Sequence, residues 1–248
     1  MKSLRLRFLV IAAVAALGLG MLASMPAARA QDGTPTNEFP VNIRFVNAMT
    51  SLDKIDVYIN GDESDQRVVE GLEYGTVSDA YQGTAPVTAV IVKQNVNSGF
   101  DRYLYQVVVP TEAGKEYLVV VSDLLIIPTE VDLSATGEDQ ARVRAINGAA
   151  QAPALDFYLT RASDATVVGD LSPVVTDVRF GQATDAGEVH SGSYDITGKA
   201  TGTDTVAVES NGVSIEAGQS YTFVVIGSPG STDHPLTILQ VGQATTAS

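Results

Sequence analysis

Apolar and polar residues alternate along two short segments near the start of the chain. Every second residue from 41 to 45 is apolar, and residues 55–59 repeat this pattern after a short loop. An alternation with a period of two is typical of a half-buried β-strand. The pattern therefore predicts two strands, with a turn at Asn60-Gly61, where both residues tolerate positive φ.

The same unit occurs again 100 residues later. Residues 43–59 and 143–159 share four identical residues (Arg, Asn, Asp and Tyr), and most of their apolar positions exchange one apolar residue for another. Later landmarks also recur, since Phe180-Gly181 corresponds to Tyr74-Gly75. The offset drifts between 100 and 106, as insertions in loops would cause. The repeat predicts two similar domains in tandem.

Further short apolar runs follow in each unit, separated by turn residues and without helical periodicity. They lie at 87–92, 103–109 and 117–121 in the first unit, and at 206–208, 221–226 and 236–241 in the second. About seven short strands per unit favour a β-sandwich. We therefore expect an all-β protein with two tandem antiparallel β-sandwich domains of immunoglobulin or transthyretin-like type.

The expected boundaries follow from these patterns. They comprise a signal peptide at 1–30, a flexible leader at 31–40, a first sandwich at 41–127, a linker at 128–140, a second sandwich at 141–242 and a polar tail at 243–248. Within the linker, residues 130–133 could instead add an edge strand.

The first thirty residues have the pattern of a bacterial secretory signal. Lys2, Arg5 and Arg7 precede an apolar run at 8–22, and Ala28-Arg29-Ala30 is a small-x-small cleavage site. A membrane anchor is the alternative, but the run has about fifteen apolar residues where a span needs ~20. We expect an exported protein in the periplasm, at the cell surface or outside the cell, with no membrane span in the mature chain.

Charge and cysteine content exclude several functions. Cleavage removes four of the 15 basic residues and none of the 29 acidic ones, which leaves a formal net charge of about −18. Such a charge repels nucleic acid, so a nucleic-acid partner is not expected. The sequence has no cysteine, which excludes disulfides, thiol nucleophiles and thiolate metal sites.

Several short motifs carry a family resemblance. They are residues 143–148 (Val-Arg-Ala-Ile-Asn-Gly), 152–158 (Ala-Pro-Ala-Leu-Asp-Phe-Tyr), 71–78 (Gly-Leu-Glu-Tyr-Gly-Thr-Val-Ser) and the Ala-Gly-x-x-Tyr turns at 113–117 and 217–221. Both units resemble the bacterial domain of unknown function 4397. The resemblance implies an exported or surface-associated β-sandwich and carries over no catalytic residue. A histidine common in such domains is replaced here by Asn47 and Asn147.

Two Arg and Asp combinations recur in the repeat, namely Arg44 with Asp56 and Arg144 with Asp156. If the two strands pair, each Arg could meet its Asp across the ladder. We expect such a structural pair to fix the strand register, because exposed cross-strand ion pairs are common and contribute only about 0.2–1 kcal/mol. A pair of charges that grips a ligand is the alternative.

An acidic loop in the first unit offers candidates for a Ca²⁺ site. Asp62, Glu63 and Asp65, with Asp53 nearby, supply the oxygen ligands that this ion prefers. Their spacing does not match an EF-hand, and a solvated acidic loop is the preferred interpretation. No cofactor is expected.

Histidines and tyrosines are the remaining candidates. His190 and His234 are the only histidines, and the nucleophile motif G-x-S-x-G is absent, so we expect no catalytic residue and no enzyme. Six tyrosines of the first unit could form a sugar-binding strip or pack their rings in the core: Tyr58, Tyr74, Tyr81, Tyr103, Tyr105 and Tyr117.

The sequence as a whole favours a non-enzymatic exported module with a structural or binding role. Its expected partner is an unidentified protein or a polysaccharide of the cell envelope or matrix. A carbohydrate- or Ca²⁺-binding module that uses loops at one end of each sandwich is the main alternative. An extracellular hydrolase built on carboxylate pairs is a further one.

Overall fold

The computed structural model describes residues 40–60, 65–84, 89–94, 102–161 and 173–244. The chain divides into two units, Met1–Thr36 and Asn37–Ser248, and every described residue belongs to the second. Strands, turns and loops make up these residues. None of the described residues forms a helix that is long and apolar enough to cross a membrane.

The first repeat consists of strands β1 to β8, which form two four-stranded sheets. The strands are β1 (Pro40–Ala48), β2 (Lys54–Asn60), β3 (Asp65–Glu73), β4 (Tyr81–Thr84), β5 (Ala89–Gln94), β6 (Arg102–Val107), β7 (Glu116–Ser122) and β8 (Ile126–Val131). One sheet has the order β4-β1-β7-β8 and the other the order β3-β2-β5-β6. We call them the β1 sheet and the β2 sheet.

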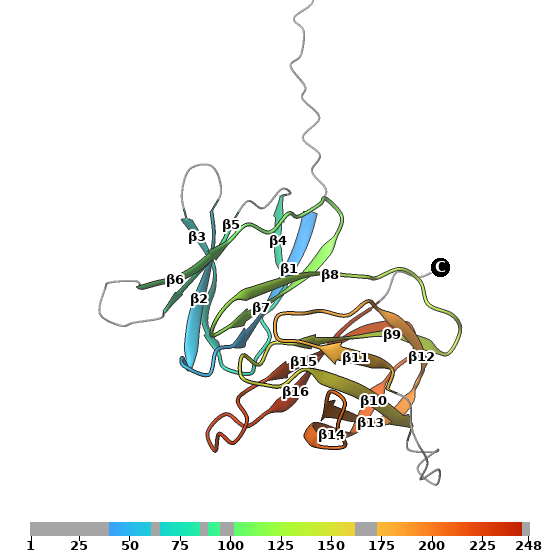
Figure 1. Ribbon diagram of the computed structural model, residues 1–248. Coiled ribbons are helices and arrows are strands. Elements are labelled where there is room, and N and C mark those ends of the chain that lie inside the picture. Colours follow the sequence, from blue (N-terminus) through green and yellow to red (C-terminus); the bar gives the residue numbers. More distant parts are fainter. Residues whose placement is uncertain (1–39, 61–64, 85–88, 95–101, 162–172, 245–248) are drawn as a thin grey trace, which may run out of the picture. The chain divides into compact units, whose positions relative to one another are not determined.

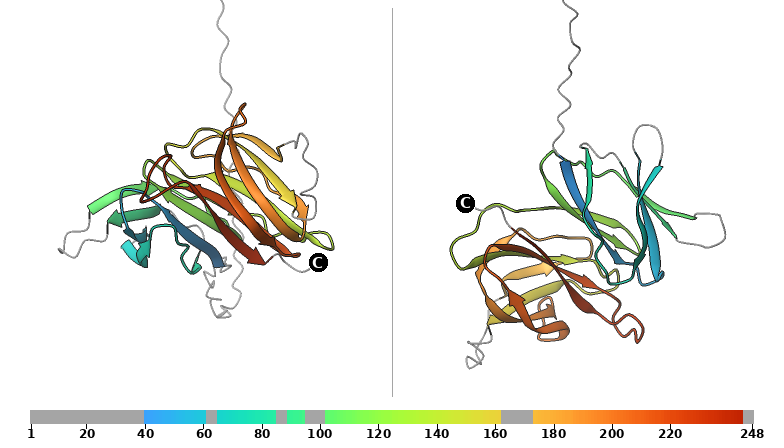
Figure 2. Two further views of the ribbon diagram at one scale, coloured as in Figure 1. Left: turned by 90° about the horizontal axis from the view of Figure 1, so that it is seen from below. Right: turned by 180° about the vertical axis from the view of Figure 1, so that it is seen from behind.

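The second repeat builds the same pair of sheets from strands β9 to β16. The strands are β9 (Gln140–Asn147), β10 (Leu155–Arg161), β11 (Val175–Val178), β12 (Gly187–His190), β13 (Gly192–Ala200), β14 (Val206–Ile215), β15 (Gln219–Ile226) and β16 (Thr237–Ala244). The β9 sheet has the order β12-β9-β15-β16, and the β10 sheet has the order β11-β10-β13-β14. Figures 1 and 2 show the strands of the first repeat in blue to green and those of the second in yellow to red.

This architecture confirms the predicted all-β fold with two sandwich-like units. The sequence did not indicate that each sandwich contains one parallel pair of strands. β1 runs parallel to β7, with Phe45 opposite Val119, and β9 runs parallel to β15, with Ala145 opposite Phe223. Matching registers in the two repeats allow each side chain to be compared with its counterpart.

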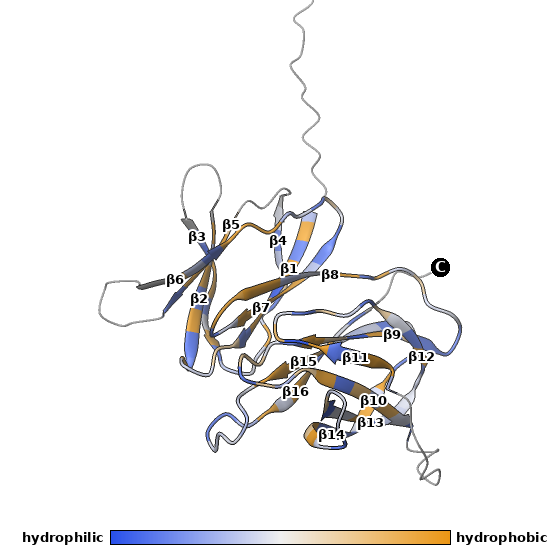
Figure 3. Ribbon diagram, in the orientation of Figure 1, coloured by the Kyte–Doolittle hydropathy of each residue, from blue (hydrophilic) through white to orange (hydrophobic). Residues whose placement is uncertain are grey.

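Alternating side chains from the two sheets of each repeat form its core. Figure 3 shows the hydrophobic and hydrophilic bands that alternate along β1. In the first repeat Ile43 and Phe45 from the β1 sheet are fully buried together with Ile55 and Val57 from the β2 sheet. Burial of this apolar face stabilises the sandwich at roughly 25 cal/mol per Å².

The region predicted as a linker is partly a strand. β8 covers Ile126–Val131 and pairs antiparallel with β7, so residues 128–131 belong to the edge of the β1 sheet. Pro128 is compatible with this position, since an edge strand leaves one side of its backbone without a ladder partner. The limits of the two domains themselves stay a prediction.

A buried asparagine closes the end of β1 and of β9. Asn47 is fully buried, donates from Nδ2 to the carbonyl oxygen of Leu72 at 3.0 Å, and accepts the backbone N–H of Met49 at Oδ1. Asn147 likewise donates to the carbonyl oxygen of Val178 at 3.1 Å. Each amide satisfies backbone groups that would otherwise be buried without partners. We assign both asparagines a structural role.

A third apolar cluster lies between the β1 sheet and the β9 sheet. Val46 and Val120 of the first repeat pack here with Ile146 and Val224 of the second. These residues occupy the faces of the two sheets that point away from the sandwich cores, because successive side chains on a strand alternate between faces. The two repeats therefore share an apolar contact besides their separate cores.

Candidate functional site

The predicted pairing of Arg44 with Asp56 and of Arg144 with Asp156 is wrong. It required the two strands that carry each pair to be neighbours in one sheet. Instead, β1 and β2 belong to different sheets, and so do β9 and β10. The short loop between the strands crosses from one layer of the sandwich to the other, which places each Arg and its Asp on different ladders.

Both aspartates bind the backbone of the edge strand next to their own, which is β3 for Asp56 and β11 for Asp156. Asp56 Oδ1 accepts the N–H of Gly71 at 2.6 Å, and Asp156 Oδ1 accepts the N–H of Asp177 at 2.8 Å. Gly71 and Asp177 both have positive φ, at 60° and 55°. The backbone N–H of Asp177 and further hydrogen-bond donors hold the pKa of Asp156 below its usual range. Each aspartate thus stabilises a left-handed backbone position.

Both arginines reach into the other repeat. Arg44 Nη1 donates to the carbonyl oxygen of Gly242 at 3.3 Å, and Arg144 Nη1 donates to that of Glu130 at 2.7 Å. Glu130 and Gly242 hold equivalent places on β8 and β16, opposite Tyr117 and Tyr221 respectively. The two contacts are therefore reciprocal.

The acidic loop offers no metal site among the described residues. Asp62 and Glu63 lie outside these residues, and Asp65 starts β3 opposite Asn60. No group of three His, Cys, Asp or Glu side chains in the described ranges could hold a metal ion. The Ca²⁺ candidates thus stay a prediction from the sequence.

The two histidines lie in separate places, with His190 at the end of β12 and His234 between β15 and β16. The carbonyl oxygen of His190, at the end of β12, accepts the hydroxyl of Tyr194 at 2.7 Å. His234 packs its ring against Tyr74, with 4.2 Å between the ring centroids. The ring contact indicates a packing role for His234, whereas His190 makes its contact through the backbone and its side chain is exposed.

The tyrosines of the first repeat differ in burial. Tyr58 and Tyr117 are buried, and Lys93 Nζ lies 3.9 Å from the centre of the Tyr58 ring. Tyr81 and Tyr105 pack partly buried against the core, whereas the side chain of Tyr103 lies outside the described part of the chain. The packing of these four rings matches the core alternative rather than an exposed sugar-binding strip.

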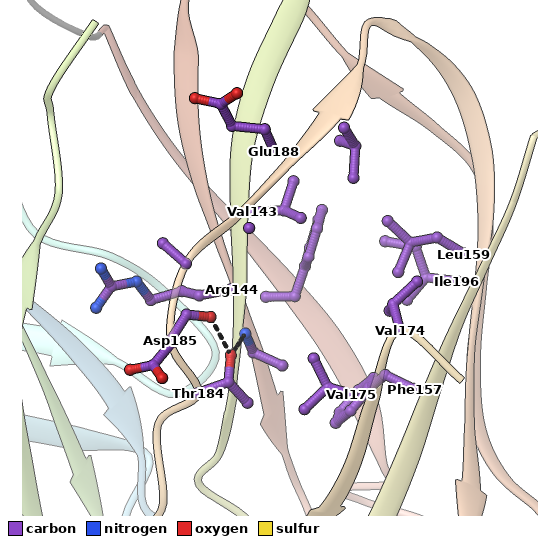
Figure 4. A pocket seen from close by; sticks show the side chains of 15 residues that line it. Val143, Arg144, Phe157, Leu159, Val174, Val175, Thr184, Asp185, Glu188 and Ile196 are labelled. Carbon is purple, nitrogen blue, oxygen red and sulfur yellow. Dashed lines mark hydrogen bonds between the residues drawn. The ribbon is translucent and has the colours of Figure 1, made fainter. Parts of the chain in front are cut away.

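A cavity of about 500 Å³ opens between the two sheets of the second repeat. Most of its wall is apolar side chain, and it is lined by Val143, Ala145, Phe157, Leu159, Val174, Val175, Ala186, Val189, Ile196 and Phe223 together with Arg144, Thr184, Asp185, Gly187 and Glu188. Figure 4 shows Val143 facing Leu159, Ile196 and Val174 across the open space. Its volume is in the range of small-molecule sites, about 300–1,000 Å³.

The hydroxyl of Thr184 in the cavity wall already has two partners within the fold. Thr184 Oγ1 accepts the backbone N–H of Ala145 and donates to the carbonyl oxygen of Asp185, each at 3.0 Å. The guanidinium of Arg144 points away from the apolar side chains in Figure 4. The interior therefore favours an apolar group over a sugar, whose hydroxyls would lose hydrogen bonds to water.

The first repeat aligns with this site residue by residue. Ser78 accepts the N–H of Phe45 at 3.0 Å in the same way as Thr184 accepts that of Ala145. Three positions after each hydroxyl, Tyr81 pairs with Ile43 and Gly187 pairs with Val143. Tyr81 and Phe45 of the first repeat therefore correspond to Gly187 and Ala145 of the second.

The two small residues leave the space that forms the cavity. Tyr81 packs against the first core, whereas a Cβ added at Gly187 would meet no atom within 4 Å. Ile43 is fully buried, but its counterpart Val143 is partly exposed. Phe157 and Phe223 stand where the first repeat has Val57 and Val119. These larger side chains make up for only part of the side-chain volume that is missing at Ala145 and Gly187.

Fold and repeat together define a protein made of two tandem β-sandwich modules. The chain belongs to the family described as domain of unknown function DUF4397, whose model matches residues 41–158 and 159–247. The border between the two matches lies within β10, whereas the sheets divide between β8 and β9. A search of curated proteins found no match.

Two solved structures are among those that resemble this chain. CBMbc (family CBM26) from Eubacterium rectale Amy13K, solved in complex with maltoheptaose, is 14% identical, with 84% of this chain and 98% of that chain covered and a TM-score of 0.25. A candidate cell adhesion protein from Bacteroides eggerthii DSM 20697 is 12% identical, with 83% and 95% covered and a TM-score of 0.26. With TM-scores this low, neither structure bears on what the chain binds.

Sequence reasoning missed this cavity. The substitutions that create it lie at residues 145 and 187, and only the offsets between the repeats point to them. Ala145 aligns with Phe45 when the repeats are compared at an offset of 100 residues. Gly187 aligns with Tyr81 only at an offset of 106. A comparison of side-chain volume between the repeats, made with the drifting offset, would have found both.

Proposed function

We propose that the chain is an exported, non-catalytic binding module whose second repeat binds a small apolar molecule or the apolar part of an amphiphile. The observation that carries this proposal is the apolar cavity where Gly187 and Ala145 stand in place of Tyr81 and Phe45. Export is supported by the basic, apolar and small-residue pattern of the first thirty residues.

The chemistry of the cavity supports binding without turnover. A catalytic site needs polar groups that can change their partners during a reaction. The Thr184 hydroxyl instead fixes the chain to β9 through the N–H of Ala145. An apolar ligand would gain roughly 25 cal/mol for each Å² of apolar surface that it removes from water.

A neutral fluorescent probe tests the proposal. N-phenyl-1-naphthylamine is apolar and uncharged, and its emission rises when it leaves water. We expect saturable fluorescence enhancement with the protein comprising residues 31–248. Gly187→Tyr should abolish it, because the new ring copies Tyr81 and fills the cavity. Gly187 has no positive φ, so the change is compatible with its backbone.

Ser214→Tyr is the matched control for this experiment. Ser214 is exposed on β14 and does not line the cavity, so the added ring should leave probe binding unchanged. Circular dichroism would verify that both variants are folded. Absence of binding by the unaltered protein, or equal binding by the Gly187→Tyr variant, would refute the proposal.

A further inference from the structure

The rim of the cavity presents carboxylates to solvent while its arginines are covered. Glu188 pairs with Arg142 at 3.0 Å, yet the Glu188 side chain is 40% exposed and that of Arg142 only 12%. Arg142 also binds Asp132, whose side chain is 44% exposed. A group that arrives at this rim from water therefore meets negative charge first.

Asp185 adds a second exposed carboxylate at the same rim. It follows Thr184 directly and makes no ion pair within 4.0 Å among the described residues, although its charge acts at longer range on the Arg144 guanidinium. The nearby Arg144 is turned away from the cavity and donates to the carbonyl oxygen of Glu130. Burial lowers the pKa of the Arg144 guanidinium. Its hydrogen bonding thus serves the contact between repeats rather than the rim.

We infer that the preferred ligand is an amphiphilic amine, with its apolar part in the cavity and its cationic head at the rim near Asp185 and Glu188. This inference rests on the proposed function, since it assigns a head group to the ligand of the same cavity. The acidic mature chain, with a formal net charge of about −18, adds a long-range field that attracts cations and repels anions.

Three ligands with one tail and different heads test the inference. Decylamine is cationic at pH 7.4, decanol is neutral and decanoate is anionic. Each is titrated against bound N-phenyl-1-naphthylamine, the two ions below their micelle concentrations and decanol below its solubility limit. We expect decylamine to bind about fivefold more tightly than decanoate, with decanol between them, because exposed charge interactions are this weak. The difference should shrink in 0.5 M NaCl, where screening acts within a few Å.

A charge-removing variant assigns the effect to the rim. Asp185→Asn should narrow the gap between decylamine and decanoate and leave decanol binding unchanged. Asp233→Asn removes one charge from an exposed position outside the cavity lining and should preserve the gap. Equal effects of both variants would mean that net charge alone selects the ligand and would overturn the role of the rim.

The outcomes separate this inference from the proposed function. If neither the probe nor decanol binds, the proposed function fails. If decanol binds but decanoate binds as tightly as decylamine, or more tightly, the cavity stands and the amine inference alone is wrong.

Discussion

The two repeats fill the space between their sheets with different side chains on the same frame. In the first repeat Phe45 and Tyr81 occupy the side where β1 meets β4. In the second repeat Ala145 and Gly187 stand at these places, and the space remains open. Strand order, parallel pairing and the Ser or Thr hydroxyl that binds β1 or β9 are the same in both.

The two sheets of a repeat can therefore form the same sandwich without a filled core on the side where β9 meets β12. An open space in a core lowers stability, but a fold persists when its remaining apolar contacts are sufficient. The second repeat keeps Phe157, Ile196 and Phe223 in contact around the opening. A ligand site can therefore arise from a few positions while the fold is unchanged.

The largest expected effect comes from opening the first repeat. Phe45→Ala removes a fully buried ring and should lower the free energy of unfolding by about 3–5 kcal/mol in urea titrations. The reverse change, Ala145→Phe, is the matched control and should alter stability by no more than about 1–2 kcal/mol, because it enters an existing cavity. A loss below about 1 kcal/mol at Phe45 would mean that the first core is as open as the second.

A medium effect is expected at Asp156, which binds β11 and the connection between β13 and β14 in the second repeat. Asp156→Asn should cost about 1–3 kcal/mol at pH 7, because the carboxylate accepts the N–H of Asp177, the Thr201 hydroxyl and the N–H of Gly202. The pKa of Asp156 is lowered in the folded state. Its contribution is therefore complete above the unfolded pKa of about 3.9 and is lost as the pH falls through the folded value.

Urea titrations at pH 7 and below pH 3 would check this. The difference between the unaltered protein and the Asp156→Asn variant should shrink at the lower pH. Asp233→Asn, at an exposed position, should show little difference at either pH. A constant difference at both pH values would show that geometry, not the charge of Asp156, stabilises the connection.

The smallest expected effect concerns the reciprocal arginines. Arg144→Met should lower stability by about 1 kcal/mol, because one charged hydrogen bond is lost while the costly burial of a guanidinium is relieved. Arg44→Met should cost less, since its bond to Gly242 is longer, at 3.3 Å. Thermal melts of both variants would measure these losses of stability. A larger loss for Arg44→Met than for Arg144→Met would contradict the ranking.

The sequence was sufficient for the fold class because alternation and turn residues are local signals, and the repeat indicates that the same unit occurs twice. Residues 41–45 and 55–59 indicate strands without any knowledge of their neighbours. Which strands pair is a long-range property, so the parallel contact of β1 with β7 escaped prediction. The wrong assignment of Arg44 to Asp56 has the same origin, since strands adjacent in sequence were treated as adjacent in one sheet.

The site was less predictable than the fold for a physical reason. An apolar cavity is defined by missing side-chain volume, and no residue type marks missing volume in a sequence. Gly187 follows an ordinary loop pattern, and its meaning appears only when its register with Val143 is compared with that of Tyr81 and Ile43.

The reciprocal contacts of Arg44 and Arg144 have a consequence for symmetry. Each repeat offers the same strand face and the same edge carbonyl to the other, which is the geometry of a twofold dimer. Such a face is complementary to a copy of itself. The two repeats therefore pair within one polypeptide as the subunits of a homodimer pair across their interface, although one has Phe45 and Tyr81 where the other has an open space.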